Sequence, residues 1–143
     1  MSKKIPTPKT ITANWLTDQL RANGHEDASV SDFSLERIGT GQSGMCMRIS
    51  MNLQGGSSAP SSLVAKFPAD DPISRETGVV MGTYEKEVTF YRDLAPQLAI
   101  SLPACYYSDI DGEGPDFLIL MEDINKGSQG DQLAGCSPEV AHA

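Results

Sequence analysis

The sequence has few of the residues that build metal or disulfide sites. It contains three cysteines and two histidines in 143 residues. Cys46, Cys105 and Cys136 stand far apart and form neither a CxxC pair nor a Cys/His cluster, so they indicate neither a zinc site nor a disulfide framework. His25 and His142 stand alone, and an isolated histidine is more often a surface residue than a ligand. A reducing, cytoplasmic location fits this pattern best.

Positive charge and long apolar runs are also scarce. The chain has 11 Lys and Arg against 19 Asp and Glu, a net charge of −8. Nucleic acid and anionic membranes both need a basic face, so neither is expected as the main partner. No apolar run approaches the roughly 18 residues that cross a bilayer. The first residues lack the apolar stretch of a secretory signal. An acidic surface would suit a cationic substrate, but solubility explains it as well.

The chain is long enough for one domain. Residues 1–10 are rich in Lys and Pro and are predicted to form a loose leader. Residues 11–24 predict a short amphipathic helix, with Thr12 as N-cap and with Leu16 and Leu20 on one face.

Strands are predicted by composition and by a period of two. The alternation is clearest at residues 45–53, where an apolar residue stands at every second position. A Gly-containing turn at residues 111–114 joins two apolar runs and indicates a hairpin. Five strands are expected, at residues 30–38, 45–53, 62–67, 105–110 and 116–121.

The remaining segments complete the expected fold. Residues 83–94 predict a helix because apolar residues recur at spacings of four and three. Residues 69–82 are polar and contain glycine, so an irregular connection is expected there. Ser137 and Pro138 have the pattern of a helix start. The predicted class is α+β, with an antiparallel sheet of about five strands, a packed helix and an N-terminal helix.

Three glycines, Gly39, Gly41 and Gly44, match the pattern G-x-G-x-x-G. In a dinucleotide-binding fold this pattern leads into a helix, whereas here it leads into the alternating strand. The context favours a glycine-rich flap between two strands, where backbone N–H groups can approach phosphate oxygens. A hairpin loop without a ligand remains the alternative.

Lys66 lies in an otherwise apolar predicted strand. Its ammonium must reach solvent or find an anion, because burying it unpaired costs several kcal/mol. Glu87, on the predicted helix that follows, is the candidate partner, and Glu85 is the alternative. An edge-strand lysine and a solvated helix face would be the non-functional interpretations.

Residues 116–124 read as an apolar strand that runs into an acidic linker. A buried strand and its exit would look equally apolar. Four features nevertheless occur in the order and at roughly the distances that the N-terminal lobe of a kinase requires. They are the glycine flap, the lysine in a strand, the glutamate in a helix and this apolar strand.

Residues 35–44, 63–68, 84–91 and 118–124 together resemble the aminoglycoside phosphotransferase-like and ecdysteroid-kinase-like families. Residues 130–137 are similar to the segment that follows the hinge in those proteins. The resemblance implies a protein-kinase-like fold that holds ATP between two lobes and passes a phosphoryl group to a small-molecule hydroxyl. It implies an N-terminal lobe at residues 11–122, and a hinge with the start of a C-terminal lobe at residues 123–143.

The resemblance also implies roles for particular residues. The flap would cover the phosphates, the lysine would bind them, the glutamate would orient the lysine, and the hinge would contact adenine. The implied ATP-binding residues are Gly39, Thr40, Gly41, Gln42, Ser43, Gly44, Lys66, Glu87, Met121, Glu122, Asp123 and Ile124.

The catalytic residues of such enzymes are not expected in this chain. They need a catalytic Asp in a His-x-Asp loop and a further Asp that holds Mg²⁺, and both belong to the C-terminal lobe. Asp123 and Asp131 do not match those motifs, so the chain alone is expected to be inactive. A non-catalytic nucleotide-binding module and a plain interaction domain remain alternatives. The sequence does not identify the acceptor, so aminoglycoside, choline-like and steroid-like molecules remain alternatives.

Overall fold

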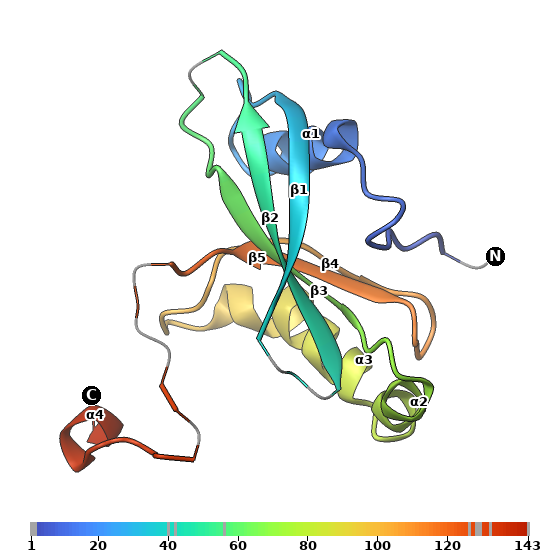
Figure 1. Cartoon of the computed structure of the whole chain (residues 1–143), viewed down its shortest axis with the longest axis vertical. Coiled ribbons are helices and arrows are strands. Elements are labelled where there is room, and N and C mark those ends of the chain that lie inside the picture. The colour runs from blue at the N-terminus through green and yellow to red at the C-terminus, as the bar shows by residue number, and fades with distance from the viewer. Residues whose placement is uncertain are drawn as a thin grey trace.

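The computed structural model describes residues 3–39, 41, 43–55, 57–125, 127, 130–131 and 133–142. The fold is α+β, with an antiparallel five-stranded sheet in the order β1-β2-β3-β5-β4 and helices packed against it (Figure 1). The predicted class is confirmed at this level. The strands are β1 (Val30–Ile38), β2 (Gly44–Leu53), β3 (Ser62–Pro68), β4 (Cys105–Ile110) and β5 (Phe117–Glu122).

The helices lie before, between and after these strands. They are α1 (Ala13–Ala22), α2 (Pro72–Val80), α3 (Thr83–Thr89) and α4 (Pro138–His142), with the short turns η1 (Phe90–Leu94) and η2 (Ala95–Gln97) directly after α3.

One face of the sheet carries the larger part of the core. Alternate residues of a strand point to the same face, and in β2 these include Met45, Ile49 and Met51, which are buried. Leu16 and Leu20 of α1 pack against them with no exposed surface. The predicted alternation of β2 and the apolar face of α1 are therefore confirmed. Thr12 accepts a hydrogen bond from the Trp15 N–H at 3.1 Å, which confirms it as the N-cap.

The leader is anchored to the fold rather than loose. Ile5 is buried in the same core as α1. The Lys3 backbone N–H donates to the Asp111 carboxylate at 2.9 Å, and the Lys3 ammonium pairs with Asp109. An apolar residue among lysines and prolines thus holds this segment through burial, which its overall composition does not reveal.

The second face of the sheet receives α3. Tyr84 and Val88 of α3 pack with Phe117 and Ile119 of β5, and all four are buried. The rings of Tyr84 and Phe117 have centroids 4.5 Å apart, a stacked arrangement. The two faces therefore have separate apolar clusters, one under α1 and one under α3.

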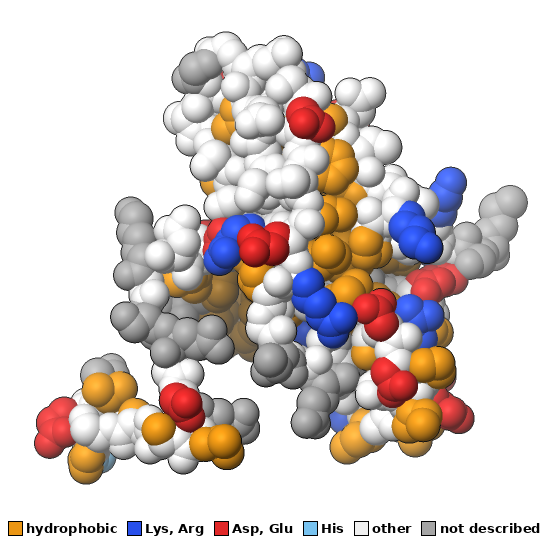
Figure 2. Space-filling model, viewed as in Figure 1, with side chains coloured by type: hydrophobic (Ala, Val, Ile, Leu, Met, Phe, Trp, Pro, Cys, Tyr) orange, Lys and Arg blue, Asp and Glu red, His pale blue; other side chains and the backbone are white. Residues whose placement is uncertain are grey.

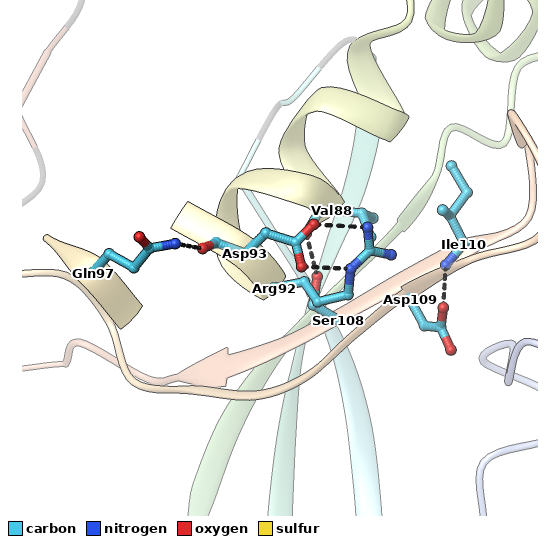
Figure 3. Close-up of polar contacts among 7 residues, drawn as sticks. All are labelled: Val88, Arg92, Asp93, Gln97, Ser108, Asp109 and Ile110. Atoms are coloured by element: carbon cyan, nitrogen blue, oxygen red, sulfur yellow. Dashed lines mark hydrogen bonds and ion pairs between the residues drawn. The ribbon is translucent and has the colours of Figure 1, made fainter. Parts of the chain in front are cut away.

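The end of α3 is fastened to β4. The Ser108 hydroxyl donates to the Val88 carbonyl at 3.0 Å (Figure 3). The helix predicted over residues 83–94 continues beyond Val88 as a π-helical turn, η1. Farther along, the Gln97 amide donates to the Asp93 carbonyl at 2.6 Å. These bonds satisfy polar groups where the helix ends.

The expectation of an irregular connection at residues 69–82 is wrong, because this segment contains α2. Asp71 is its N-cap and accepts from the Ser74 N–H at 2.8 Å, and Pro72 occupies the first turn. Gly78 is buried where α2 meets the Tyr84 ring of α3. The glycine that suggested irregularity is instead needed for close packing.

The predicted helix start after residue 137 is confirmed as α4. None of its residues is buried, and Figures 1 and 2 show it apart from the sheet, with apolar side chains facing outward. Within the described part of the chain, no helix is both long enough and apolar enough to span a bilayer.

Gly78→Ala tests the packing of α2 on α3. An ideal Cβ at this position would lie 2.4 Å from Cζ of Tyr84. Alanine normally stabilises a helix interior by roughly 0.5–1 kcal/mol relative to glycine, but overpacking costs about 1–3 kcal/mol. We expect the free energy of unfolding, measured by urea denaturation, to fall. Thr77→Ala, on the exposed side of the same helix, should change it by less than about 0.5 kcal/mol. A Gly78→Ala protein as stable as the wild type would contradict this packing.

Candidate functional site

Lys66 and Glu87 form an ion pair between β3 and α3. The Lys66 Nζ donates to both carboxylate oxygens of Glu87, at 2.7 and 2.8 Å. Both side chains are about three-quarters covered, with 23% and 24% of their surface exposed. The prediction that Lys66 finds its anion on the helix predicted over residues 83–94 is confirmed. The partner is Glu87 rather than Glu85, which is exposed.

The rotation of α3 aims Glu87 at the lysine. Tyr84 and Val88 are buried against the sheet, and Glu87 stands three residues after the first and one before the second. In the β3–β5 register, Lys66 lies opposite Ile119, which belongs to the same apolar cluster as Tyr84 and Val88. Burial of the two apolar residues therefore places the carboxylate over the lysine.

Gly44, at the end of the glycine flap where β2 begins, packs against the stem of Lys66. Gly39 has φ of 70°, a conformation that favours glycine. An ideal Cβ at Gly41 would lie 2.9 Å from the Gly44 carbonyl oxygen, and one at Gly44 would lie 2.8 Å from Cε of Lys66. A side chain at either position would displace the flap or the lysine stem. Ser43 is exposed, and Thr40 and Gln42 lie outside the described residues.

The linker residues predicted as a hinge gather at a groove of about 1070 Å³. The groove lies beside β2, β3 and the end of β5. Its lining includes Ile38, Arg48, Ser62, Val64, Met121, Glu122, Asp123 and Ile124. Four of these lining residues were not predicted from the sequence, namely Ile38, Arg48, Ser62 and Val64.

The groove and the ion pair share one face of the sheet. Val64 and Lys66 are two residues apart in β3 and therefore point the same way. In the β2–β3 register, Arg48 lies opposite Val64 and Cys46 lies opposite Lys66. Neither Lys66 nor Glu87 lines the groove itself. The structure thus gathers the predicted residues as two neighbouring groups, a lysine–glutamate group under the flap and a linker group along the groove.

Asp123 is held by a cluster of hydrogen bonds that the sequence did not predict. Arg48 donates through Nε to Oδ2 at 2.7 Å and through Nη2 to Oδ1 at 3.2 Å, and the Ser62 hydroxyl donates to Oδ2 at 2.8 Å. The Asp123 side chain is only 4% exposed. Arg48 could be found in the sequence as the one charge on the β2 face opposite the methionines.

These contacts act on the charge of Asp123. The hydrogen bond from Arg48 is the main reason that the pKa of the Asp123 carboxyl is lowered, and the bond from Ser62 adds to it, while burial opposes both. Asp123 is therefore a carboxylate at neutral pH whose oxygens are already engaged.

Cys46 lies next to the ion pair, opposite Lys66 across β2 and β3. Burial raises the pKa of its thiol, and the neighbouring Lys66 ammonium only partly offsets this rise. The thiol stays protonated at neutral pH, so it is not an activated nucleophile.

No protein-family model matches the sequence, and no curated protein sequence matches it.

Glu87→Gln tests the energetic weight of the ion pair. The change keeps the shape of the side chain but leaves the largely covered Lys66 ammonium without its counter-charge. We expect a loss of about 1–3 kcal/mol of unfolding free energy, because exposed pairs contribute about 0–1 kcal/mol and breaking buried pairs costs about 3–5 kcal/mol. The measurement is chemical denaturation. Glu85→Gln is the matched control on the exposed side of α3 and should change stability by less than about 0.5 kcal/mol. Equal effects of the two changes would contradict the arrangement.

Asp123→Asn tests the Asp123 cluster by its pH dependence. The pKa of Asp123 is lower in the folded protein than in the unfolded chain, where it is about 3.9. The carboxylate therefore stabilises the fold above about pH 3.9, and this contribution is lost as the pH falls through the folded-state pKa. We expect the free energy of unfolding, measured by urea denaturation, to be higher for the wild type than for Asp123→Asn. The difference should be largest near neutral pH and should shrink progressively below about pH 4.

Arg48→Met provides the control background for this experiment. Without the guanidinium, the effect of Asp123→Asn should become small and nearly independent of pH. Other acidic groups are common to both proteins in each comparison and cancel. A stability difference that stays constant from pH 6 to pH 3 in the presence of Arg48 would contradict the assignment.

Proposed function

We propose that this chain is the nucleotide-binding lobe of a kinase-like small-molecule phosphotransferase, which holds ATP so that its γ-phosphoryl group can pass to a hydroxyl acceptor. The observation that carries the proposal is the Lys66–Glu87 pair lying directly against Gly44 of the glycine flap. A lysine held by a helix glutamate beneath such a flap is the arrangement that kinases use to bind nucleotide phosphates.

The order of the elements supports the same proposal. An antiparallel five-stranded sheet, with α3 between β3 and β4 along the chain, agrees with the architecture that the resemblance to kinase-like phosphotransferases implies. The flap joins β1 and β2, the lysine lies on β3, and the linker leaves β5. Each proposed role thus belongs to the element that such a lobe would use.

The phosphate end of the proposed site consists of the flap and Lys66. Gly41 and Gly44 lack the side chains that would fill the space beside the Gly44 carbonyl and the lysine stem. Backbone N–H groups of a glycine-rich flap can then reach phosphate oxygens. The Lys66 ammonium supplies positive charge, and Glu87 holds it on the face of the sheet that α3 covers.

The base end of the proposed site is the groove. Ile38, Val64 and Met121 line it and supply apolar surface for a planar ring, and the linker residues Glu122, Asp123 and Ile124 line it as well. Since the Asp123 carboxylate is engaged by Arg48 and Ser62, this residue would offer the base its backbone rather than its side chain.

The chemical step requires groups beyond this site. When bound, Mg²⁺ neutralises charge on the β- and γ-phosphates, and an Asp accepts the proton of the acceptor hydroxyl. Within the described ranges, no group of three or more His, Cys, Asp or Glu side chains could hold a metal ion. In this proposal the metal ligands and the catalytic base belong to a C-terminal lobe, together with the residues that choose the acceptor.

Lys66→Met tests the nucleotide role. ATP at about 100 times its dissociation constant should stabilise the wild type by about 2.7 kcal/mol. We expect Lys66→Met to raise the dissociation constant by about 10- to 100-fold, because it removes a charged hydrogen-bond donor worth about 1.5–3 kcal/mol. Isothermal titration calorimetry with ATP measures the affinity, and a thermal shift assay measures the stabilisation.

Lys86→Met is the matched control. Lys86 lies on the exposed side of α3 and donates to the Met81 carbonyl, so its removal should leave ATP affinity unchanged. ATP binding that survives Lys66→Met would contradict the proposed site. A wild type that gains no stability from ATP would favour an interaction module instead.

A further inference from the structure

The linker leaves the sheet at a point where backbone pairing ends. The β3–β5 ladder runs as far as the pair Leu63–Glu122, and Asp123 is the next residue. Beyond this pair, the side chain of Asp123 takes over the attachment, because it is bound by Arg48 of β2 and Ser62 of β3. The Asn125 N–H donates to the Asp123 carbonyl at 3.0 Å and closes a turn directly after the attachment point.

We infer that Arg48 is a positioning residue for base recognition, because it holds Asp123 against β2 and β3 and so fixes the linker at the edge of the groove before a ligand binds. This inference rests on the proposed nucleotide-binding function. It assigns Arg48 and Ser62 a role in the site.

The geometry of the contact is what makes it a positioning device. A bidentate arginine–carboxylate pair fixes both distance and orientation, which a single ammonium contact does not. The two partners are 75 residues apart in the chain, so the pair joins the flap strand to the linker. Ser62 adds a third bond from the strand that lies between them.

The low solvent exposure of the Asp123 carboxylate indicates how the Arg48–Asp123 pair would act on a ligand. The Asp123 side chain is 4% exposed and that of Arg48 is 35% exposed, so the carboxylate is turned away from solvent while part of Arg48 still lines the groove. A base entering the groove meets a linker whose shape is already set. Pre-organisation of this kind raises affinity by lowering the entropy lost on binding.

The test compares probes that contain the base with one that lacks it. Wild type, Arg48→Met, Asp123→Asn, Ser62→Ala and the double variant Arg48→Met/Asp123→Asn are titrated with ADP, adenosine and inorganic tripolyphosphate by calorimetry. We expect dissociation constants for ADP and adenosine to rise about tenfold in both charge variants and less in Ser62→Ala. Tripolyphosphate, which would use the flap and Lys66, should change by less than about twofold. The double variant should bind no more weakly than either single variant, because both remove the same contact.

A second measurement follows the linker itself. Amide hydrogen exchange at residues 122–125 without ligand should speed up in Arg48→Met and Asp123→Asn, because the attachment point is lost. The matched control is the exposed pair of Arg37 and Asp70, at 3.2 Å with 55% and 66% of the side chains exposed. Arg37→Met and Asp70→Asn should alter neither the exchange nor any of the affinities.

The outcomes separate this inference from the function on which it rests. Unchanged ADP and adenosine affinities in the charge variants would overturn the positioning role, even if linker exchange increases. Equal weakening of all three probes would also overturn it, because the pair would then support the whole lobe. A wild type that binds tripolyphosphate but neither ADP nor adenosine would overturn the inference and leave only a phosphate site. A wild type that binds none of the three would overturn the proposed function, and this inference with it.

Discussion

A charged lysine in the middle of a sheet is the constraint on which this architecture depends. Lys66 is in β3, with β2 on one side and β5 on the other, so its ammonium cannot leave the sheet at an edge. An anion must therefore come from whatever covers that face, and Glu87 supplies it. This requirement fixes how α3 is turned, because Tyr84 and Val88 must be buried in the same orientation that brings the carboxylate to the lysine. Apolar packing and charge neutralisation therefore require the same orientation of α3. Such agreement between independent interactions favours one structure over its alternatives.

The two faces of the sheet differ in what they bury and in what they leave polar. The face under α1 is closed by methionine, leucine and isoleucine side chains, with Ile5 of the leader completing it. The opposite face has a smaller apolar cluster and carries Cys46, Arg48 and Lys66 on alternate positions of β2 and β3. Because the first face already supplies most of the buried apolar surface, the second can keep polar groups and a groove without losing the fold.

Much of the fold was readable from periodicity, and the central part of the site was readable from order along the chain. The alternation in β2 predicted a strand because a period of two has no helical equivalent, and the sequence of flap, Lys66 and Glu87 predicted the ion pair. The helix α2 was missed because Gly78 lowers helix propensity, whereas its packing on Tyr84 is a tertiary effect. The Asp71-Pro72 start was a local signal that could have revealed it.

The contact between Arg48 and Asp123 shows where sequence reasoning reaches its limit. Each residue alone reads as a surface charge, and their pairing depends on the register of β2 with β3 and of β3 with β5. A shift of one residue in the β2–β3 ladder would turn Arg48 toward the face under α1, and a shift in the β3–β5 ladder would move Asp123 away from Arg48. The register is itself held by burial of residues such as Ile49, Leu63 and Leu120 on the other face. The apolar core therefore determines, through strand register, which charges meet at the linker.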